Sequence, residues 1–115
     1  MVTMTSTLTH ITFDCADATT LATFWSAVLD RPVPEDASSD YVQLAGQPTW
    51  SFFAVPEPKA AKNRVHVDLA VDDLEAEVAR ISALGAVRLG DFDEAGYRWT
   101  TFADPDGNEF DVVAA

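Results

Sequence analysis

The sequence has almost no cysteine, and it lacks long apolar runs. Its 115 residues include a single cysteine, Cys15, which cannot form a disulfide within the chain and is typical of a reducing compartment. No apolar stretch reaches the length of about 18 residues that a membrane-spanning helix requires. The N-terminal residues MVTMTSTLTH lack the basic start and the apolar centre of a secretory signal. We therefore expect a cytoplasmic protein that does not enter a membrane.

Basic residues are also scarce. Seven lysines and arginines stand against 19 aspartates and glutamates, which gives a formal net charge of −12. This charge repels a phosphate backbone, and the sequence has no basic stripe interleaved with aromatic residues. We therefore expect no nucleic acid partner, and we interpret the acidity as a contribution to solubility.

Several catalytic motifs are missing. There is no glycine-rich phosphate loop, and no serine lies in a nucleophile motif. The acidic segment DPDGN (104–108) lacks the spaced ligands and the terminal glutamate of a calcium loop, so we interpret it as a turn. Cys15 lies on the predicted helix-facing side of its strand, which favours a buried apolar role over a nucleophilic one. These absences leave the histidines and the carboxylates as the candidates for chemistry.

The sequence contains an internal repeat with a shift of 56 positions, and one further residue is inserted before the last aligned pairs, which raises the shift to 57. The aligned pairs include His10 with His66, Asp17 with Asp73, Tyr41 with Tyr97 and Phe53 with Phe110.

The predicted elements repeat as well. The first half has a strand at 8–15, a helix at 18–29 capped by Asp17, and strands at 41–45 and 49–55. The second half has a strand at 64–71, a helix after the capping box Asp72-x-x-Glu75, and strands at 86–90, 97–103 and 109–113.

We interpret each half as a β-α-β-β-β module and the fold class as α+β. The chain, residues 1–115, is then a single domain with module one at 8–56, a linker at 57–63 and module two at 64–113. Neither small module can bury both faces of its own sheet. Pairing is therefore expected to give one continuous curved mixed sheet around a concave pocket, with the helices outside.

Strand alternation predicts which side chains face the concave pocket. The residues opposite the helices are His10, Thr12 and Asp14 in the first strand, His66, Asp68 and Ala70 in the fifth, and Glu109 and Asp111 in the last. Two imidazoles and a carboxylate, from His10, His66 and Asp111, are a sufficient ligand set for a divalent transition metal. The repeat places the equivalent of Asp111, the fourth corner of the metal site, at Ala54. Because Ala54 has no donor atom, coordination positions on the metal remain open for water or substrate. Alternatively, Asp14 and Asp68 form a hydrogen-bonded network with the histidines or fix their tautomers.

Aromatic residues are the candidates for a ligand-binding wall. One face of the predicted strand at 49–55 carries Trp50, Phe52 and Ala54, because these residues alternate along it. We assign them to the same face of the sheet as His10, and Trp99 is a further candidate on this face. Aromatic walls around a few polar groups are typical of small-molecule pockets. The alternative is that these aromatic residues belong to the core, as they do in most small domains.

The segments HITFDCAD, VHVDLAVDD and DPDGNEFDV, together with the paired modules, resemble the vicinal oxygen chelate superfamily over residues 8–113. That superfamily includes glyoxalase I, extradiol dioxygenases, fosfomycin-resistance proteins and bleomycin-binding proteins, and the chain is similar to its small bacterial glyoxalase-like members. The resemblance implies metal ligands at His10, His66 and Asp111, with Ala54 or Phe53 at the fourth position. Glyoxalase I usually has a ligand there, so the resemblance does not extend to its reaction. It also implies a homodimer.

Two functions follow as hypotheses. In the first, iron, manganese, nickel, cobalt or zinc at His10, His66 and Asp111 acts as a Lewis acid on a small molecule, in lyase, isomerase or dioxygenase chemistry. The base in this enzyme is Asp14, Asp68 or Glu109. The alternative is a metal-free binding or sequestering protein of the bleomycin-resistance type. It would hold an aromatic or cationic molecule between Trp50, Phe52 and Trp99.

Overall fold

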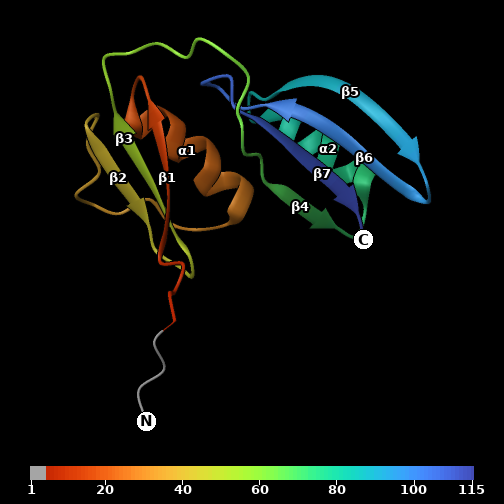
Figure 1. The fold of residues 1–115 in the computed structure, drawn as a ribbon, viewed down its shortest axis with the longest axis horizontal. Helices are drawn as coiled ribbons and strands as arrows, with labels where there is room; N and C mark the ends of the chain where they lie inside the picture. Colours follow the sequence, from red (N-terminus) through yellow and green to blue (C-terminus); the bar gives the residue numbers. More distant parts are fainter. Residues whose placement is uncertain (1–4) are drawn as a thin grey trace. The chain divides into compact units, whose positions relative to one another are not determined.

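The chain folds into two helices and seven strands over the part that the computed structural model describes, residues 5–115 (Figure 1). The elements are β1 (His10–Cys15), α1 (Ala18–Leu29), β2 (Tyr41–Leu44), β3 (Thr49–Ala54), β4 (Asp68–Val71), α2 (Leu74–Ala83), β5 (Val87–Glu94), β6 (Tyr97–Ala103) and β7 (Glu109–Ala114). The strands form two mixed sheets, so the predicted α+β class is confirmed. Within the described residues, neither helix has the length and the apolar character required to cross a membrane.

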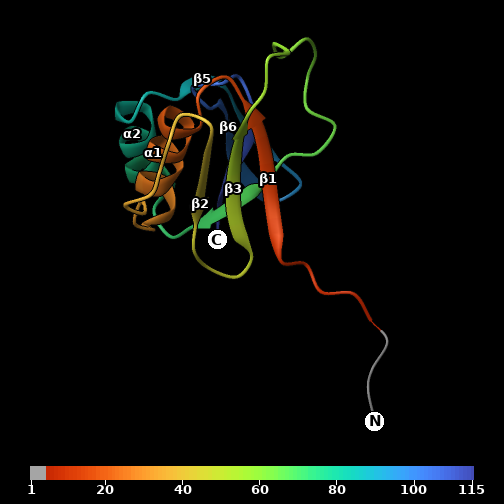
Figure 2. The same cartoon turned by 90° about the vertical axis from the view of Figure 1, so that its left-hand side faces the viewer.

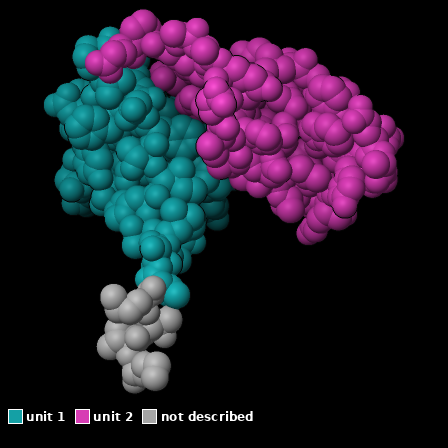
Figure 3. All heavy atoms as spheres, viewed as in Figure 1, with its two compact units in different colours: residues 1–56 teal, residues 57–115 magenta. Residues whose placement is uncertain are grey.

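The chain divides into two compact units, residues 1–56 and 57–115 (Figure 3). The strands of each unit hydrogen-bond among themselves into a sheet of their own, one with three strands and one with four, rather than into one continuous sheet as predicted. Module one has three strands in its described part, not four. The segment between α1 and β2 contains Pro32 and Pro34, and proline cannot donate a hydrogen bond to a sheet. The assignment of both modules to a single domain stays a prediction.

In the first unit the strand order is β1-β3-β2, with β1 parallel and β2 antiparallel to the central strand β3 (Figure 2). Helix α1 packs against β2 and β3. It begins after Asp17, whose Oδ1 accepts a hydrogen bond from the backbone N–H of Thr20 at 2.9 Å. The predicted cap and the predicted bounds of this helix are therefore confirmed.

The core of the first unit is an aromatic cluster beneath α1. The ring centroids of Trp25 and Trp50 lie 4.9 Å apart, and those of Phe13 and Phe52 lie 5.6 Å apart. Trp50 pairs with Ile11, and Phe52 with Phe13, so both aromatic residues lie on the helix side of the sheet. The prediction that Trp50 and Phe52 share the face of His10 is therefore wrong, and the core alternative is the correct one.

In the second unit the strand order is β4-β7-β6-β5, and only the pair β4 and β7 is parallel. Helix α2 packs against β7, and its stripe of Leu74, Val78 and Ile81 is buried. Phe110 and Val112 of β7 are buried too, while Glu109 and Asp111 are half-buried. The predicted alternation of β7 is therefore confirmed.

Strand β4 is shorter than the predicted strand 64–71. Its register with β7 begins at the pair Asp68 and Asp111, and the N–H of Asp111 donates to the carbonyl of Val67 at 3.0 Å. Residues 64–66 precede this ladder, so strand pairing does not fix their side chains. Val65, which was predicted to face the helix, is 80% exposed for this reason.

Helix α2 has a different cap from the predicted one. Asp73, not Asp72, is the N-cap, and its Oδ1 accepts a hydrogen bond from the backbone N–H of Ala76 at 3.1 Å. Glu75 pairs with Arg98 instead of closing a capping box. We expect Asp73→Ala to lower the free energy of unfolding by about 1 kcal/mol in urea denaturation. Asp72→Ala is the matched control and should change it little; equal effects of the two substitutions would contradict the assigned cap.

Candidate metal centre and ligand pocket

One imidazole and two carboxylates meet on the open face of the second sheet, opposite α2. His66 Nε2 lies 3.3 Å from Asp68 Oδ1 and 3.4 Å from Asp111 Oδ2. One donor atom from each of these residues lies within 4.8 Å of the others. His66 and Asp68 are about half exposed, whereas the side chain of Asp111 is 19% exposed. The cluster is therefore reachable from solvent and anchored at Asp111.

The parallel pairing of β4 and β7 produces this arrangement. Asp68 and Asp111 are register partners, so their side chains leave the sheet side by side on one face. His66 is two residues before Asp68. The segment that carries it is tied to the start of β7 by Asn63, whose Oδ1 accepts from the N–H of Glu109 at 3.2 Å and whose Nδ2 donates to Asn108 Oδ1 at 3.0 Å.

The turn before β7 is itself held by Asp104, a buried carboxylate. Its Oδ1 accepts hydrogen bonds from the backbone N–H groups of Asp106 and Asn108, each at 2.9 Å. Gly107 has φ +89°, a conformation that favours glycine. The interpretation of DPDGN as a turn is therefore confirmed, and this turn supports the histidine through Asn108 and Asn63.

The donor set fits a divalent transition metal. Ligands bound to one such ion at about 2.0–2.2 Å lie about 2.8–3.6 Å from each other in octahedral and tetrahedral sites. The separations of 3.3 Å and 3.4 Å between His66 Nε2 and the two carboxylates fall in this range. Imidazole and carboxylate together suit iron, manganese, nickel, cobalt and zinc.

The position of Asp68 does not suit a residue that fixes the tautomer of His66. Such a carboxylate binds the ring nitrogen that faces away from the metal. Asp68 and Asp111 instead both lie near the same nitrogen, Nε2. Asp68 is therefore a candidate ligand in addition to the predicted set.

Thr101 is a site residue that the sequence analysis missed. It is the cross-strand partner of Asp111, and its hydroxyl donates a hydrogen bond to Asp111 Oδ1 at 2.6 Å. This bond leaves Oδ2 directed to the side of His66. The sequence offered one indication that Thr101 belongs to the site. Thr101 is two positions from Trp99, so the two side chains lie on the same face of β6.

His10 lies on the open face of the first sheet, as predicted, and is exposed. Its Nδ1 is 2.9 Å from the hydroxyl of Thr9, and its Nε2 is 3.4 Å from Nε2 of Gln43. Asp14 is exposed on the same face, next to its register partner Phe53. A common ligand set of His10, His66 and Asp111 stays a prediction, as does a catalytic role for Asp14, Asp68 or Glu109.

The fourth corner of the repeat is Ser51, not Ala54. Asp68 pairs with Asp111, and its repeat equivalent Thr12 pairs with Ser51. Ala54 pairs with Cys15 on the helix side, so the prediction for that position is wrong. Ser51 is 1% exposed, and its hydroxyl has no hydrogen-bond partner among residues 5–115.

A pocket of about 360 Å³ adjoins the carboxylates of the cluster. Its lining consists of Asp68, Glu94, Ala95, Tyr97, Trp99, Asp111 and Val113. The ring of Trp99 stacks on that of Phe92 at a centroid distance of 5.1 Å. Trp99 lines this pocket together with Asp111, and its cross-strand partner is Val113, which is also in the lining. The role of Trp99 as a ligand contact stays a prediction. The volume of the pocket is in the range of small-molecule sites.

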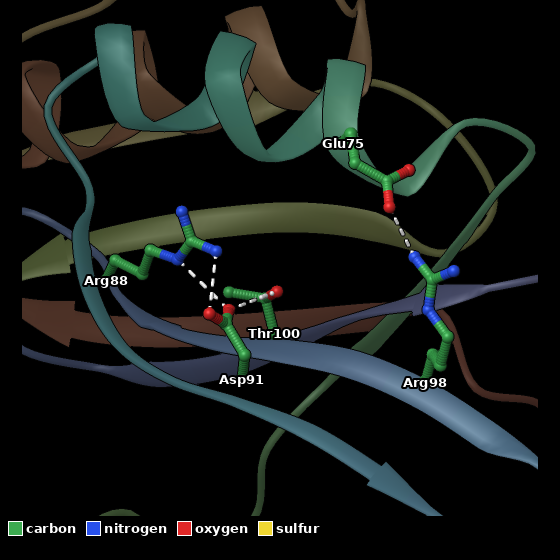
Figure 4. A network of polar contacts seen from close by, with 5 residues as sticks. All are labelled: Glu75, Arg88, Asp91, Arg98 and Thr100. Carbon is green, nitrogen blue, oxygen red and sulfur yellow. Dashed lines mark hydrogen bonds and ion pairs between the residues drawn. The ribbon is translucent and has the colours of Figure 1, made fainter.

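A separate polar network lies on the side of this sheet that faces α2 (Figure 4). Arg88 and Thr100 donate hydrogen bonds to Asp91, and together they hold the pKa of Asp91 below its ordinary value. The pKa of Glu75 is lowered too, first by its own backbone N–H and then by Arg98. The lowered pKa makes each carboxylate a weaker base, and each is paired with an arginine, so both are poor candidates for a general base.

The glyoxalase-like domain model matches residues 10–113, and no functionally curated protein matches the chain. The fold is shared with solved structures of low sequence identity. A glyoxalase/bleomycin resistance protein/dioxygenase family enzyme from Burkholderia phytofirmans PsJN has a TM-score of 0.78 at 16% identity, over 95% of this chain and 98% of the other. The fosfomycin resistance protein FosX from Listeria monocytogenes has a TM-score of 0.78 at 18% identity, over 97% and 95%.

A glyoxalase-related enzyme from Fulvimarina pelagi has a TM-score of 0.75 at 14% identity, over 96% of this chain and 89% of the other. These likenesses concern the fold. The family model covers almost the whole chain, including the predicted histidines and Asp111. The resemblance inferred from the sequence is thereby confirmed, and the chain belongs to the glyoxalase-like domain family of the vicinal oxygen chelate superfamily.

Proposed function

We propose that the chain is a metal-dependent enzyme that binds a small molecule in the pocket beside His66 and Asp111. One observation carries the proposal: His66 Nε2 lies 3.3 Å and 3.4 Å from two carboxylate oxygens at the wall of a pocket of about 360 Å³. His66 and Asp111 would hold a divalent ion, with Asp68 beside them. His10 is the further ligand that the sequence predicts.

A divalent ion bound there would supply Lewis acidity, which polarises substrate oxygens and stabilises negative charge in the transition state. Thr101 fixes the rotamer of Asp111 through the 2.6 Å hydrogen bond. Trp99 and Val113 provide an apolar wall that excludes water from one side of the substrate. A donor set of this kind is compatible with lyase, isomerase and dioxygenase chemistry.

The general base is one of three carboxylates. Asp68 and Glu109 lie on the same face of the second sheet as Asp111, and Asp14 lies on the open face of the first. If Asp68 binds the ion, the positive charge lowers the basicity of its carboxylate, so Glu109 and Asp14 are then the stronger candidates. Replacing Glu109 with glutamine and Asp14 with asparagine distinguishes them by the loss of turnover.

The further features of the proposal come from the sequence and the family resemblance. We expect a homodimer in sedimentation experiments and a cytoplasmic location. The partner is a small molecule, since a net charge of −12 disfavours nucleic acid. The fosfomycin-resistance and glyoxalase-related neighbours share the fold of this chain, and that fold is compatible with a small-molecule site.

Metal titration of the full chain tests the proposal. We expect the metal-free protein to bind zinc and manganese in isothermal titration calorimetry with micromolar or tighter affinity, and metal analysis to give one ion per chain. Absence of binding for all of iron, manganese, nickel, cobalt and zinc would overturn the metal-dependent enzyme. The metal-free binding protein would then be the better account, with Trp99 as the remaining predicted ligand contact.

A further inference from the structure

The pocket beside the cluster has two chemically different ends. Asp68 and Asp111 form one end, and Glu94 and Tyr97 form the other, where the β5–β6 hairpin turns. Trp99 lies between the two ends along β6. No basic side chain is present among the described residues that line the pocket.

The strand register sets the distance between the ends. Thr101 is the partner of Asp111, and Tyr97 is the partner of Glu94. Thr101 lies four positions after Tyr97 on the strand, which corresponds to about 14 Å. A ligand that reaches both ends must therefore be elongated, on the order of 10 Å, because side chains extend from each end.

The far end suits a cation. Glu94 is exposed and has no ion-pair partner within residues 5–115. Tyr97 and Trp99 offer aromatic faces, and Trp99 is supported by its stack on Phe92 with an interplanar angle of 17°. A positive group near an aromatic face is attracted by the ring quadrupole, and a neighbouring carboxylate adds to this attraction.

We propose that this pocket selects elongated ligands that carry metal-binding oxygens at one end and a positively charged group at the other. Glu94 pairs with the cation, and Trp99 and Tyr97 pack along the body of the ligand. This inference rests on the proposed function, because the ion at His66 and Asp111 binds the oxygen end. A ligand whose far end is an anion is repelled by Glu94.

Three catechols test the inference, because they share the chelating oxygens and differ at the far end. Dopamine ends in an ammonium, 4-ethylcatechol in a methyl group and 3-(3,4-dihydroxyphenyl)propionate in a carboxylate. We expect the zinc-loaded full chain to bind dopamine about fivefold or more tightly than 4-ethylcatechol in anaerobic titration calorimetry, and to bind the propionate most weakly. Zinc is used because it is redox-inert.

The variant Glu94→Gln should remove the preference for dopamine while keeping the affinity for 4-ethylcatechol. Asp93→Asn is the matched control, because Asp93 is the adjacent residue on β5 and lines the other side of the sheet. It should retain the preference. Equal affinities for the three catechols, or tightest binding of the propionate, would overturn this inference and leave the proposed function intact. Binding of none of them to the zinc-loaded chain would count against the proposed function itself.

Discussion

Replacing His66 with alanine lowers the affinity of the chain for zinc by at least about a hundredfold. His66 is the only imidazole in the described cluster, and its Nε2 is the atom that both carboxylates approach. Substitution of residues that merely support a metal ligand costs about 10- to 100-fold in affinity, so loss of a ligand should cost at least as much. The measurement is competitive titration of zinc against a chelator of known affinity.

The neighbouring substitution Val65→Ala is the control for this experiment. Val65 is 80% exposed and precedes the β4–β7 ladder, so its replacement should leave both the zinc affinity and the fold unchanged. His66 itself is about half exposed, and His66→Ala should keep the wild-type circular dichroism spectrum. A folded His66→Ala variant with wild-type zinc affinity would show that the ion, if bound, lies elsewhere.

Replacing Phe52 with alanine lowers the free energy of unfolding by about 3–5 kcal/mol. Phe52 is fully buried in the central strand of the first sheet, beneath α1 and against the ring of Phe13. Because a domain has about 5–15 kcal/mol of net stability, this loss removes a large part of it. Urea denaturation followed by tryptophan fluorescence measures the change.

Phe53 provides the comparison, since it is the next residue and its side chain leaves the opposite face of β3. It is 50% exposed and contacts Tyr41 edge to face. Phe53→Ala should therefore change the free energy of unfolding by about 1 kcal/mol or less. The reverse order of the two effects would mean that β3 is shifted by one residue, because such a shift exchanges the faces of every side chain.

These two phenylalanines also show where the sequence was insufficient. In β1 and β7 the apolar and polar residues alternate, so the faces of His10 and Asp111 could be predicted. In β3, TWSFFA has adjacent aromatic residues, and its small polar residue, Ser51, is buried. The repeat alignment through Phe53 and Phe110 therefore gave the wrong parity, and only the pairing of β1 with β3 corrects it.

The candidate site was predictable in its chemistry and less so in its detail. His66 and Asp111 could be assigned to one face from strand alternation. Whether Asp68 approaches Nε2 or Nδ1 depends on the rotamers of two side chains in a segment that partly precedes the ladder, which no sequence pattern specifies. Thr101 differs from its neighbour Thr100 only in the face that it occupies, so its bond to Asp111 depends on the register of β6 with β7.

A crystal structure of the zinc-soaked full chain, with anomalous data collected at the zinc edge, tests metal binding at His66 most directly. We expect one strong anomalous peak about 2.0–2.2 Å from His66 Nε2 and from a carboxylate oxygen of Asp111. The absence of an anomalous peak beside His66 and Asp111 would contradict metal binding at this site. So would peaks found only at carboxylates outside the open face of the second sheet.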